Sequence, residues 1–107
     1  MTTFDKREEG FEKRFALDEE QKFKAQARGT RLLGLWAAEK LGITGDAANT
    51  YAKEVVAADF EEAGPGDVIR KLLRDFGAKG VEVTEQAIRT KMDELLAQAA
   101  EAVKAGK

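Results

Sequence analysis

Glycine and proline interrupt the chain at three places, and these interruptions constrain the fold more than any other feature of the sequence. They lie at Gly42–Gly45, at Gly64–Gly66 around Pro65, and at Gly77–Gly80. Glycine accepts the left-handed conformation that ends a helix, and proline cannot continue the helical hydrogen-bond ladder. Between the breaks, apolar residues recur at spacings of three and four, the period of an amphipathic helix. The sequence therefore predicts an all-α domain.

The pattern predicts four helices, at about residues 18–41, 44–63, 67–78 and 84–104. Asp18 and Gln21 have the spacing of a capping box, and Thr44 and Thr84 are the expected N-caps of the second and fourth helices. Connections of only a few residues favour antiparallel neighbours. We therefore expect an antiparallel four-helix bundle over residues 18–107.

Aromatic residues and two glycines are the unusual features of the first two helices. Phe23 and Phe60 follow the apolar period, and Trp36 and Tyr51 are expected to be core aromatics rather than cofactor-stacking groups. Each glycine inside a helix weakens it by about 1 kcal/mol relative to alanine. We expect Gly29 and Gly34 to allow close helix packing; the alternative is that they open a shallow cleft for a small ligand.

Residues 1–17 do not share the helical pattern of the rest. They carry four basic and four acidic residues and three of the six phenylalanines. Phe4, Phe11 and Phe15 lie at i, i+7 and i+11, on one side of the segment if it becomes helical. Gly10 and the short length make an isolated helix marginal. We expect a flexible, partly helical tail whose aromatic side is available to a partner.

Composition excludes several classes of function. The chain has no cysteine and no histidine, and no serine occurs in it, so disulfides and Ser–His or Cys–His nucleophiles are excluded. We therefore expect no enzyme activity, no catalytic residue, no metal site and no cofactor. A net charge of −2 and no apolar run of 18 residues predict neither nucleic-acid binding nor membrane insertion. The N-terminus lacks the apolar core of a signal peptide, which favours a cytoplasmic protein.

Several stretches of the sequence carry a family resemblance. They are Phe4-Asp5-Lys6-Arg7-Glu8, Phe11-Glu12-Lys13-Arg14-Phe15-Ala16, Leu32-Leu33-Gly34-Leu35-Trp36-Ala37-Ala38, Tyr51-Ala52-Lys53-Glu54-Val55-Val56 and Ala58-Asp59-Phe60-Glu61-Glu62-Ala63-Gly64. With these blocks the chain resembles, over essentially its whole length, the zeta subunit of alphaproteobacterial F-type ATP synthases. It departs from the family pattern at Gly29-Thr30, where another basic residue and an asparagine are usual.

The resemblance implies a protein inhibitor of ATP hydrolysis by the F1 catalytic head, at the cytoplasmic face of the membrane-bound ATP synthase. It implies that the N-terminal segment becomes helical and wedges between the catalytic subunits and the central rotor subunit, where it blocks rotation. The partner-binding residues carried over are Phe4, Arg7, Glu8, Phe11, Glu12, Arg14 and Phe15.

Two other functions stay open. The helical domain could be a regulatory module that binds an anionic metabolite or nucleotide weakly, near Arg28, Arg31 or Lys40. It could also be a protein-interaction adaptor that binds an unrelated target through its surface. A basic face at Arg70, Lys71 and Arg74 is flanked by acidic residues, which favours a solvated helix face over a DNA-reading helix.

Overall fold

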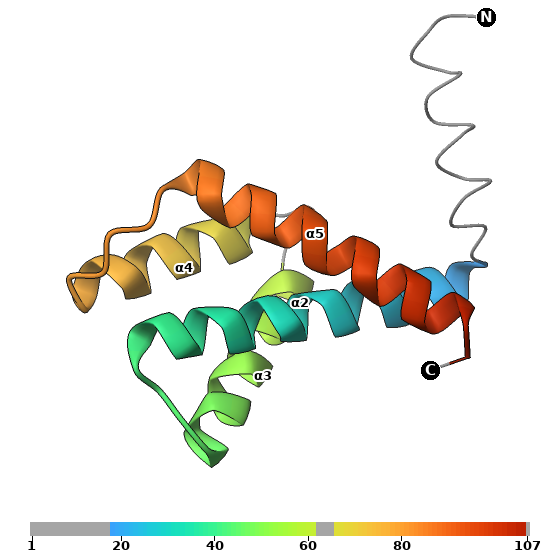
Figure 1. The fold of residues 1–107 in the computed structure, drawn as a ribbon, viewed down its shortest axis with the longest axis horizontal. Coiled ribbons are helices and arrows are strands. Elements are labelled where there is room, and N and C mark those ends of the chain that lie inside the picture. The colour runs from blue at the N-terminus through green and yellow to red at the C-terminus, as the bar shows by residue number, and fades with distance from the viewer. Residues whose placement is uncertain (1–17, 62–65, 107) are drawn as a thin grey trace, which may run out of the picture.

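The computed structural model describes residues 18–61 and 66–106, and within them every regular element is a helix (Figure 1). The helices are α2 (Glu19–Leu41), α3 (Asp46–Glu61), α4 (Gly66–Ala78) and α5 (Glu85–Lys104). The predicted all-α fold of four helices is therefore confirmed. The expected tail over residues 1–17 lies outside the described residues, as do Gly64 and Pro65.

Two of the three predicted N-caps are found in the structure. Asp18 caps α2 in a complete capping box with Gln21, and the side chain of Thr84 accepts a hydrogen bond from the Ala87 N–H at the start of α5. The expected cap at Thr44 is wrong, because α3 begins only at Asp46. Gly45 has a φ of +63° and turns the chain immediately before the helix, which places Thr44 outside it.

The longest helix, α2, is the centre of the domain and contacts each of the other three. Its most extensive contacts are with α3 and α5. Helix α5 runs antiparallel beside α2, whereas α3 crosses α2 obliquely (Figure 1). Helix α4 packs against α3 and α5 and makes only a small contact with α2.

All four helices contribute to the main hydrophobic core. Its buried residues are Leu33, Ala37, Ala38, Tyr51, Val55, Val68, Ile69, Leu72, Phe76 and Ile88. Trp36 is partly buried against this cluster and meets Phe76 edge-to-face, with ring centroids 6.0 Å apart. Trp36 and Tyr51 are thus core aromatics, as predicted. A second, much smaller cluster joins Ala25 of α2 to Ala100 of α5.

Both glycines inside α2 permit close helix packing, as the sequence predicted. A Cβ atom at Gly34 would lie 2.8 Å from the Cα atom of Ala52 on α3. A Cβ atom at Gly29 would lie 2.6 Å from a methyl carbon and 3.0 Å from the Cα atom of Leu96 on α5. These separations are shorter than carbon–carbon contact allows, so α2 approaches both neighbours only because a side chain is missing.

No helix among the described residues is both long enough and apolar enough to cross a membrane.

Candidate functional surfaces

The seven residues with an expected role in partner binding lie outside the described residues. They are Phe4, Arg7, Glu8, Phe11, Glu12, Arg14 and Phe15. What the structure does define is the point at which the domain begins. Asp18 has an extended backbone, with φ −76° and ψ 176°, and its side chain accepts a hydrogen bond from the Gln21 N–H at 2.7 Å. Helix α2 therefore has a firm start immediately after the N-terminal segment.

The three residues of the expected ligand cleft lie along α2 with different neighbours. The guanidinium of Arg31 donates a long hydrogen bond of 3.5 Å to the Asn49 side chain of α3. The Nζ atom of Lys40 lies 5.3 Å from the centroid of the Trp36 ring. Arg28 is exposed. Of the three, only Lys40 lines the groove described next.

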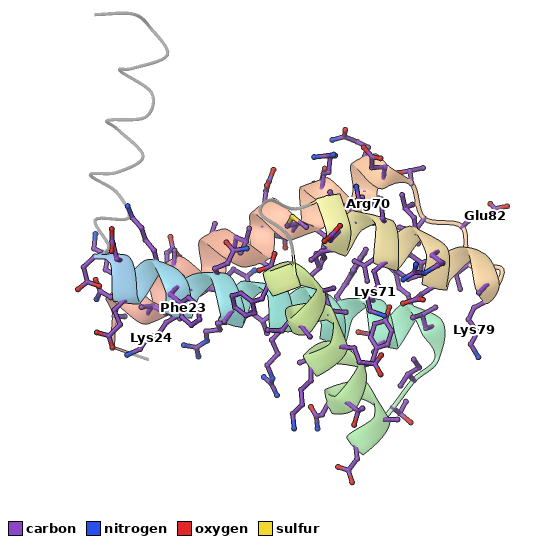
Figure 2. The ribbon with its side chains drawn as sticks, turned by 180° about the vertical axis from the view of Figure 1, so that it is seen from behind. Phe23, Lys24, Arg70, Lys71, Lys79 and Glu82 are labelled. Carbon is purple, nitrogen blue, oxygen red and sulfur yellow. The ribbon has the colours of Figure 1, made fainter. Side chains whose placement is uncertain are left out.

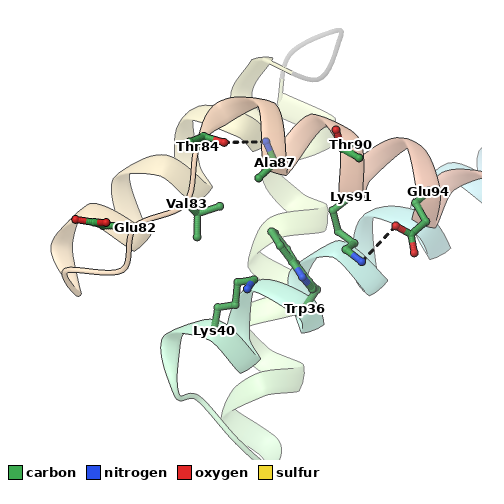
Figure 3. A pocket seen from close by; sticks show the side chains of 9 residues that line it. All are labelled: Trp36, Lys40, Glu82, Val83, Thr84, Ala87, Thr90, Lys91 and Glu94. Carbon is green, nitrogen blue, oxygen red and sulfur yellow. Dashed lines mark hydrogen bonds and ion pairs between the residues drawn. The ribbon is translucent and has the colours of Figure 1, made fainter.

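A shallow groove of about 670 Å³ lies between the end of α2 and the start of α5 (Figure 3). Trp36 forms its floor between two lysines, Lys40 and Lys91, in the close-up. Glu82 and Glu94 also line it, and Glu94 pairs with Lys91 at 3.3 Å. Two positive and two negative charges leave the groove with no net charge, so its attraction for an anionic ligand is weak.

A polar network joins α3 to α4. The hydroxyl of Tyr51 donates a hydrogen bond of 2.6 Å to the Asp75 carboxylate, and Lys71 donates to the same oxygen at 3.1 Å. Lys71 also lies 5.1 Å from the centroid of the Tyr51 ring and 3.9 Å from the Glu54 carboxylate. Only the Lys71–Asp75 pair, at i and i+4, could be found from the sequence. Tyr51 and Asp75 lie on different helices, and no local pattern predicts their contact.

The network shifts the pKa of two of its members in opposite directions. Burial raises the pKa of the Tyr51 hydroxyl, and its hydrogen bond to the Asp75 carboxylate raises it further. Burial alone would also raise the pKa of Asp75. The hydrogen bonds that Asp75 accepts from Tyr51 and Lys71 outweigh this effect, and its pKa lies below the ordinary value.

The basic face of α4 is neutralised by neighbouring carboxylates. Arg70 pairs with Asp67, and Lys71 pairs with Asp75 and Glu54. These carboxylates would repel the phosphates of a nucleic acid. The arrangement fits the expected solvated face.

Two phenylalanines are the only large hydrophobic residues that are exposed in the described part of the chain. Phe23 of α2 is 60% exposed and Phe60 of α3 is 50% exposed. Their rings stack at a centroid distance of 5.3 Å and an interplanar angle of 22°. Both follow the apolar period of their helices, yet neither is buried, because the small cluster at this end of α2 is filled by alanines and Val103 of α5. We call this pair the Phe23–Phe60 stack.

Two comparisons with known proteins found a match, one by sequence family and one by structure. A family model described as ATPase inhibitor subunit zeta matches residues 1–102. A protein structure determined by solution NMR is 49% identical in sequence and has a TM-score of 0.69. The match covers 79% of this chain and 96% of the NMR chain. The comparison with curated proteins finds no match.

Proposed function

The chain belongs to the ATPase inhibitor subunit zeta family, and from this premise we propose that residues 1–17 inhibit ATP hydrolysis by binding to the F1 head. The family name implies an ATPase inhibitor rather than an enzyme, and F1-ATPase as its partner. The observation that carries the proposal is that the family match begins at residue 1 and continues to residue 102. The N-terminal segment is therefore part of the family pattern together with the four helices.

In the proposed mechanism the segment becomes helical and wedges between the catalytic subunits and the central rotor subunit. Phe4, Phe11 and Phe15 are the apolar anchors, because their spacing places them on one side of a helix. Arg7, Glu8, Glu12 and Arg14 pair with polar groups of the head. A wedge at this position stops rotation in the direction of hydrolysis.

The phenylalanines alone cannot drive this folding. Ordering about 15 residues costs on the order of 15–30 kcal/mol at about 1–2 kcal/mol per residue. Burial of three phenylalanines returns only about 5–9 kcal/mol. Helical hydrogen bonds, the Glu9–Lys13 pair and ion pairs with the head must supply the rest. The tail charges are therefore as necessary to the proposal as the rings.

The start of α2 supports separate roles for the N-terminal segment and the four-helix domain. Asp18 is in an extended conformation, and its side chain accepts a hydrogen bond from the Gln21 N–H in the first turn of α2. With Asp18 in this conformation, a helix formed by the residues before it is separate from α2. The domain stays outside the head while the segment enters, joined to it at Asp18.

The test is ATP hydrolysis by F1 lacking this subunit, titrated with the full chain and with a chain that starts at Leu17. We expect the full chain to inhibit and the shortened chain to have no effect. A triple variant, Phe4→Ser, Phe11→Ser and Phe15→Ser, should lose inhibition, and the matched triple leucine variant should retain most of it, since leucine keeps the anchors apolar. Equal inhibition by the full and shortened chains would contradict the proposal and move the inhibitory site to the four helices.

A second candidate function rests on the Trp36 groove. Lys40 lies over an aromatic ring there, an arrangement that could hold an anionic aromatic ligand such as a nucleotide. The balanced charges of the groove make this binding weak, which is why we place it second. Titration with ATP and ADP should shift the indole signal of Trp36 if the groove is the site, and should leave it unchanged otherwise.

A further inference from the structure

The Phe23–Phe60 stack is an apolar surface for which the four helices provide no cover. Phe23 lies at the outer surface near the start of α2 (Figure 2). Beside the stack, Gln26 of α2 donates a hydrogen bond of 3.2 Å to the Asp59 carboxylate of α3. This bond connects the two helices next to the stacked rings. The stack is therefore a preformed surface rather than two independent side chains.

We propose that the Phe23–Phe60 stack is the docking site of the chain's own N-terminal segment, with Phe11 as the ring that covers it. The docked form holds the segment on the domain, and release of Phe11 frees it for F1. This inference rests on the function proposed above for residues 1–17, and it adds a regulatory state of the free chain.

The length of the segment favours Phe11 as the occupant. Phe23 lies five residues after Asp18 in α2, at a helical distance of about 7.5 Å along the axis. Phe11 lies seven residues before Asp18, and an extended chain of that length reaches about 23 Å. Phe11 can therefore turn back and reach the stack with slack. Phe15, only three residues before Asp18, reaches about 10 Å at full extension and has little length left for the turn.

Tethering makes even a weak contact effective. A short flexible connection gives the segment an effective concentration in the millimolar range at the stack. Docking of one ring orders only a few residues, so its entropic cost is far smaller than that of folding the whole segment. Aromatic pairs at ring separations of 4.5–7 Å contribute about 0.5–1.5 kcal/mol beyond the burial of their area. A third ring on the existing stack therefore gains the free energy of ring stacking and of area burial, while only a few residues lose conformational freedom.

Docking has a calculable consequence for inhibition. The apparent affinity of a chain for its partner falls in proportion to the fraction that is competent to bind. If roughly three quarters of the free chain is docked, the apparent Kd for F1 is raised about four-fold. Variants that remove the stack should then inhibit at a lower concentration than the natural chain.

The decisive experiment measures docking in the free full chain, without F1. The chain contains no cysteine, so Glu9→Cys gives a single site for a nitroxide label. In a 15N-enriched sample, a docked segment should selectively broaden the amide signals of Asp59 and Phe60. Ala100 is the matched control, because it also packs near the start of α2 but belongs to the alanine cluster with α5. An undocked segment that samples all directions would broaden both sites alike.

Substitutions then test the two rings. Phe11→Ser in the labelled chain, and separately Phe60→Ser, should abolish the selective broadening. Phe60 is half exposed, so its replacement should leave the remaining amide spectrum unchanged; Phe23→Ser provides a second variant of the stack. Equal broadening at Phe60 and Ala100, unaffected by Phe11→Ser, would overturn the proposal. Selective broadening that occurs only between labelled and 15N chains in a mixed sample would also overturn it, since the occupant would then be a second copy.

Inhibition of F1 supplies the second measurement. Phe60→Ser should lower the half-inhibitory concentration about four-fold if three quarters of the chain is docked. A higher half-inhibitory concentration would contradict the proposed competition between docking on the stack and binding to F1, because the stack would then itself be a contact with F1. Selective broadening in a chain that does not inhibit would leave the docking intact and refute the proposed function. The two proposals can therefore fail separately.

Discussion

The C-terminal half of α2 packs into the main core together with α3, α4 and α5, whereas the N-terminal half is covered mainly by α5. In the first region Leu33 lies among large buried side chains from all four helices. In the second, the buried cluster joins only Ala25 and Ala100, and Phe23 stacks with Phe60 on the surface. The helix thus has one end that packs into the main core of the domain and one end, its start after Asp18, that is thinly covered.

Because of this difference, one end of α2 determines the stability of the domain and the other end provides a surface that a partner can contact. A region with many buried apolar contacts opens only with global unfolding, and a thin region opens locally at lower free energy. Substitutions in the thin region can therefore change the surface presented to a partner without unfolding the domain.

The largest effect is expected from one phenylalanine of the core compared with one of the stack. Phe76→Ala should lower the free energy of unfolding by about 3–5 kcal/mol, because Phe76 is 1% exposed and its removal leaves a cavity. Phe23→Ala should cost under about 1 kcal/mol, because a side chain that is 60% exposed loses little buried area. Urea unfolding followed by circular dichroism measures both. Similar losses for the two variants would refute the comparison.

A smaller loss is expected where α2 approaches its neighbours through glycine. Gly34→Ala places a Cβ atom 2.8 Å from the Cα atom of Ala52, which cannot move without the backbone. We expect a net loss of about 1–3 kcal/mol, the usual cost of overpacking, despite the better helix propensity of alanine. Gly77→Ala is the matched control, since nothing lies within 4 Å of its Cβ position, and it should stabilise α4 by up to about 1 kcal/mol. A stabilising Gly34→Ala would show that the close approach is not required.

Close packing at Gly34 also shows how far the sequence could predict the structure. The break positions, the helical period and the caps at Asp18 and Thr84 are local signals, and they were sufficient for the all-α fold. For both glycines of α2 the sequence favours close packing over a ligand cleft, and their approach to Ala52 and Leu96 agrees with packing. The predicted N-cap at Thr44 is wrong because Gly45, with a φ of +63°, turns the chain between Thr44 and the start of α3 at Asp46. The sequence alone does not show where this turn ends and the helix begins.

The candidate surfaces were less predictable, because they depend on which helices meet. Phe23 and Phe60 follow the helical period, but the period alone cannot show that they lie at the surface. The contact of Tyr51 with Asp75 depends on the packing of α3 against α4. The expected cleft residues lie on one helix, yet Arg31 hydrogen-bonds Asn49 whereas Lys40 lies over Trp36. Arg31 and Lys40 lie nine residues apart in α2, which places them on opposite sides of the helix, so the helical period alone already separates them.

The polar contact between α3 and α4 should contribute less than the glycine contact. Tyr51→Phe removes the hydrogen bond to Asp75 but leaves the ring in place, and we expect a loss of about 1 kcal/mol because Asp75 still accepts from Lys71. The contribution of this contact to the free energy of unfolding should depend on pH. Since folding lowers the pKa of Asp75, the stability that ionised Asp75 contributes is present above its unfolded pKa of about 4. That stability is lost as the pH falls through the lower pKa of the folded state.

The tyrosine gives the opposite dependence at high pH. Folding raises the pKa of Tyr51, so its contribution is complete below about pH 10 and is lost as the pH rises further. The difference in unfolding free energy between the natural chain and Tyr51→Phe should therefore be largest between these limits and shrink on both sides. Urea unfolding at pH 3, 7 and 10.5 measures it, and Lys53→Met, an exposed α3 change outside the network, controls for general charge effects. A difference that is independent of pH would refute the assignment of the network.

The smallest global effect is expected at the cap that joins the N-terminal segment to α2. Asp18→Ala removes the acceptor for the Gln21 N–H and should cost roughly 0.5–1 kcal/mol, the low end for an N-cap, because the site is exposed. Since the first turn of α2 lies in the thin region, the cost should appear as faster amide hydrogen exchange at Gln21 and Lys22, with unchanged exchange at Leu33 in the core. Asp18→Asn is the matched control, because asparagine caps about as well as aspartate. Faster exchange at Leu33 as well would mean that the two ends of α2 unfold as one unit, and the thin end could not then present the Phe23–Phe60 stack independently of the core.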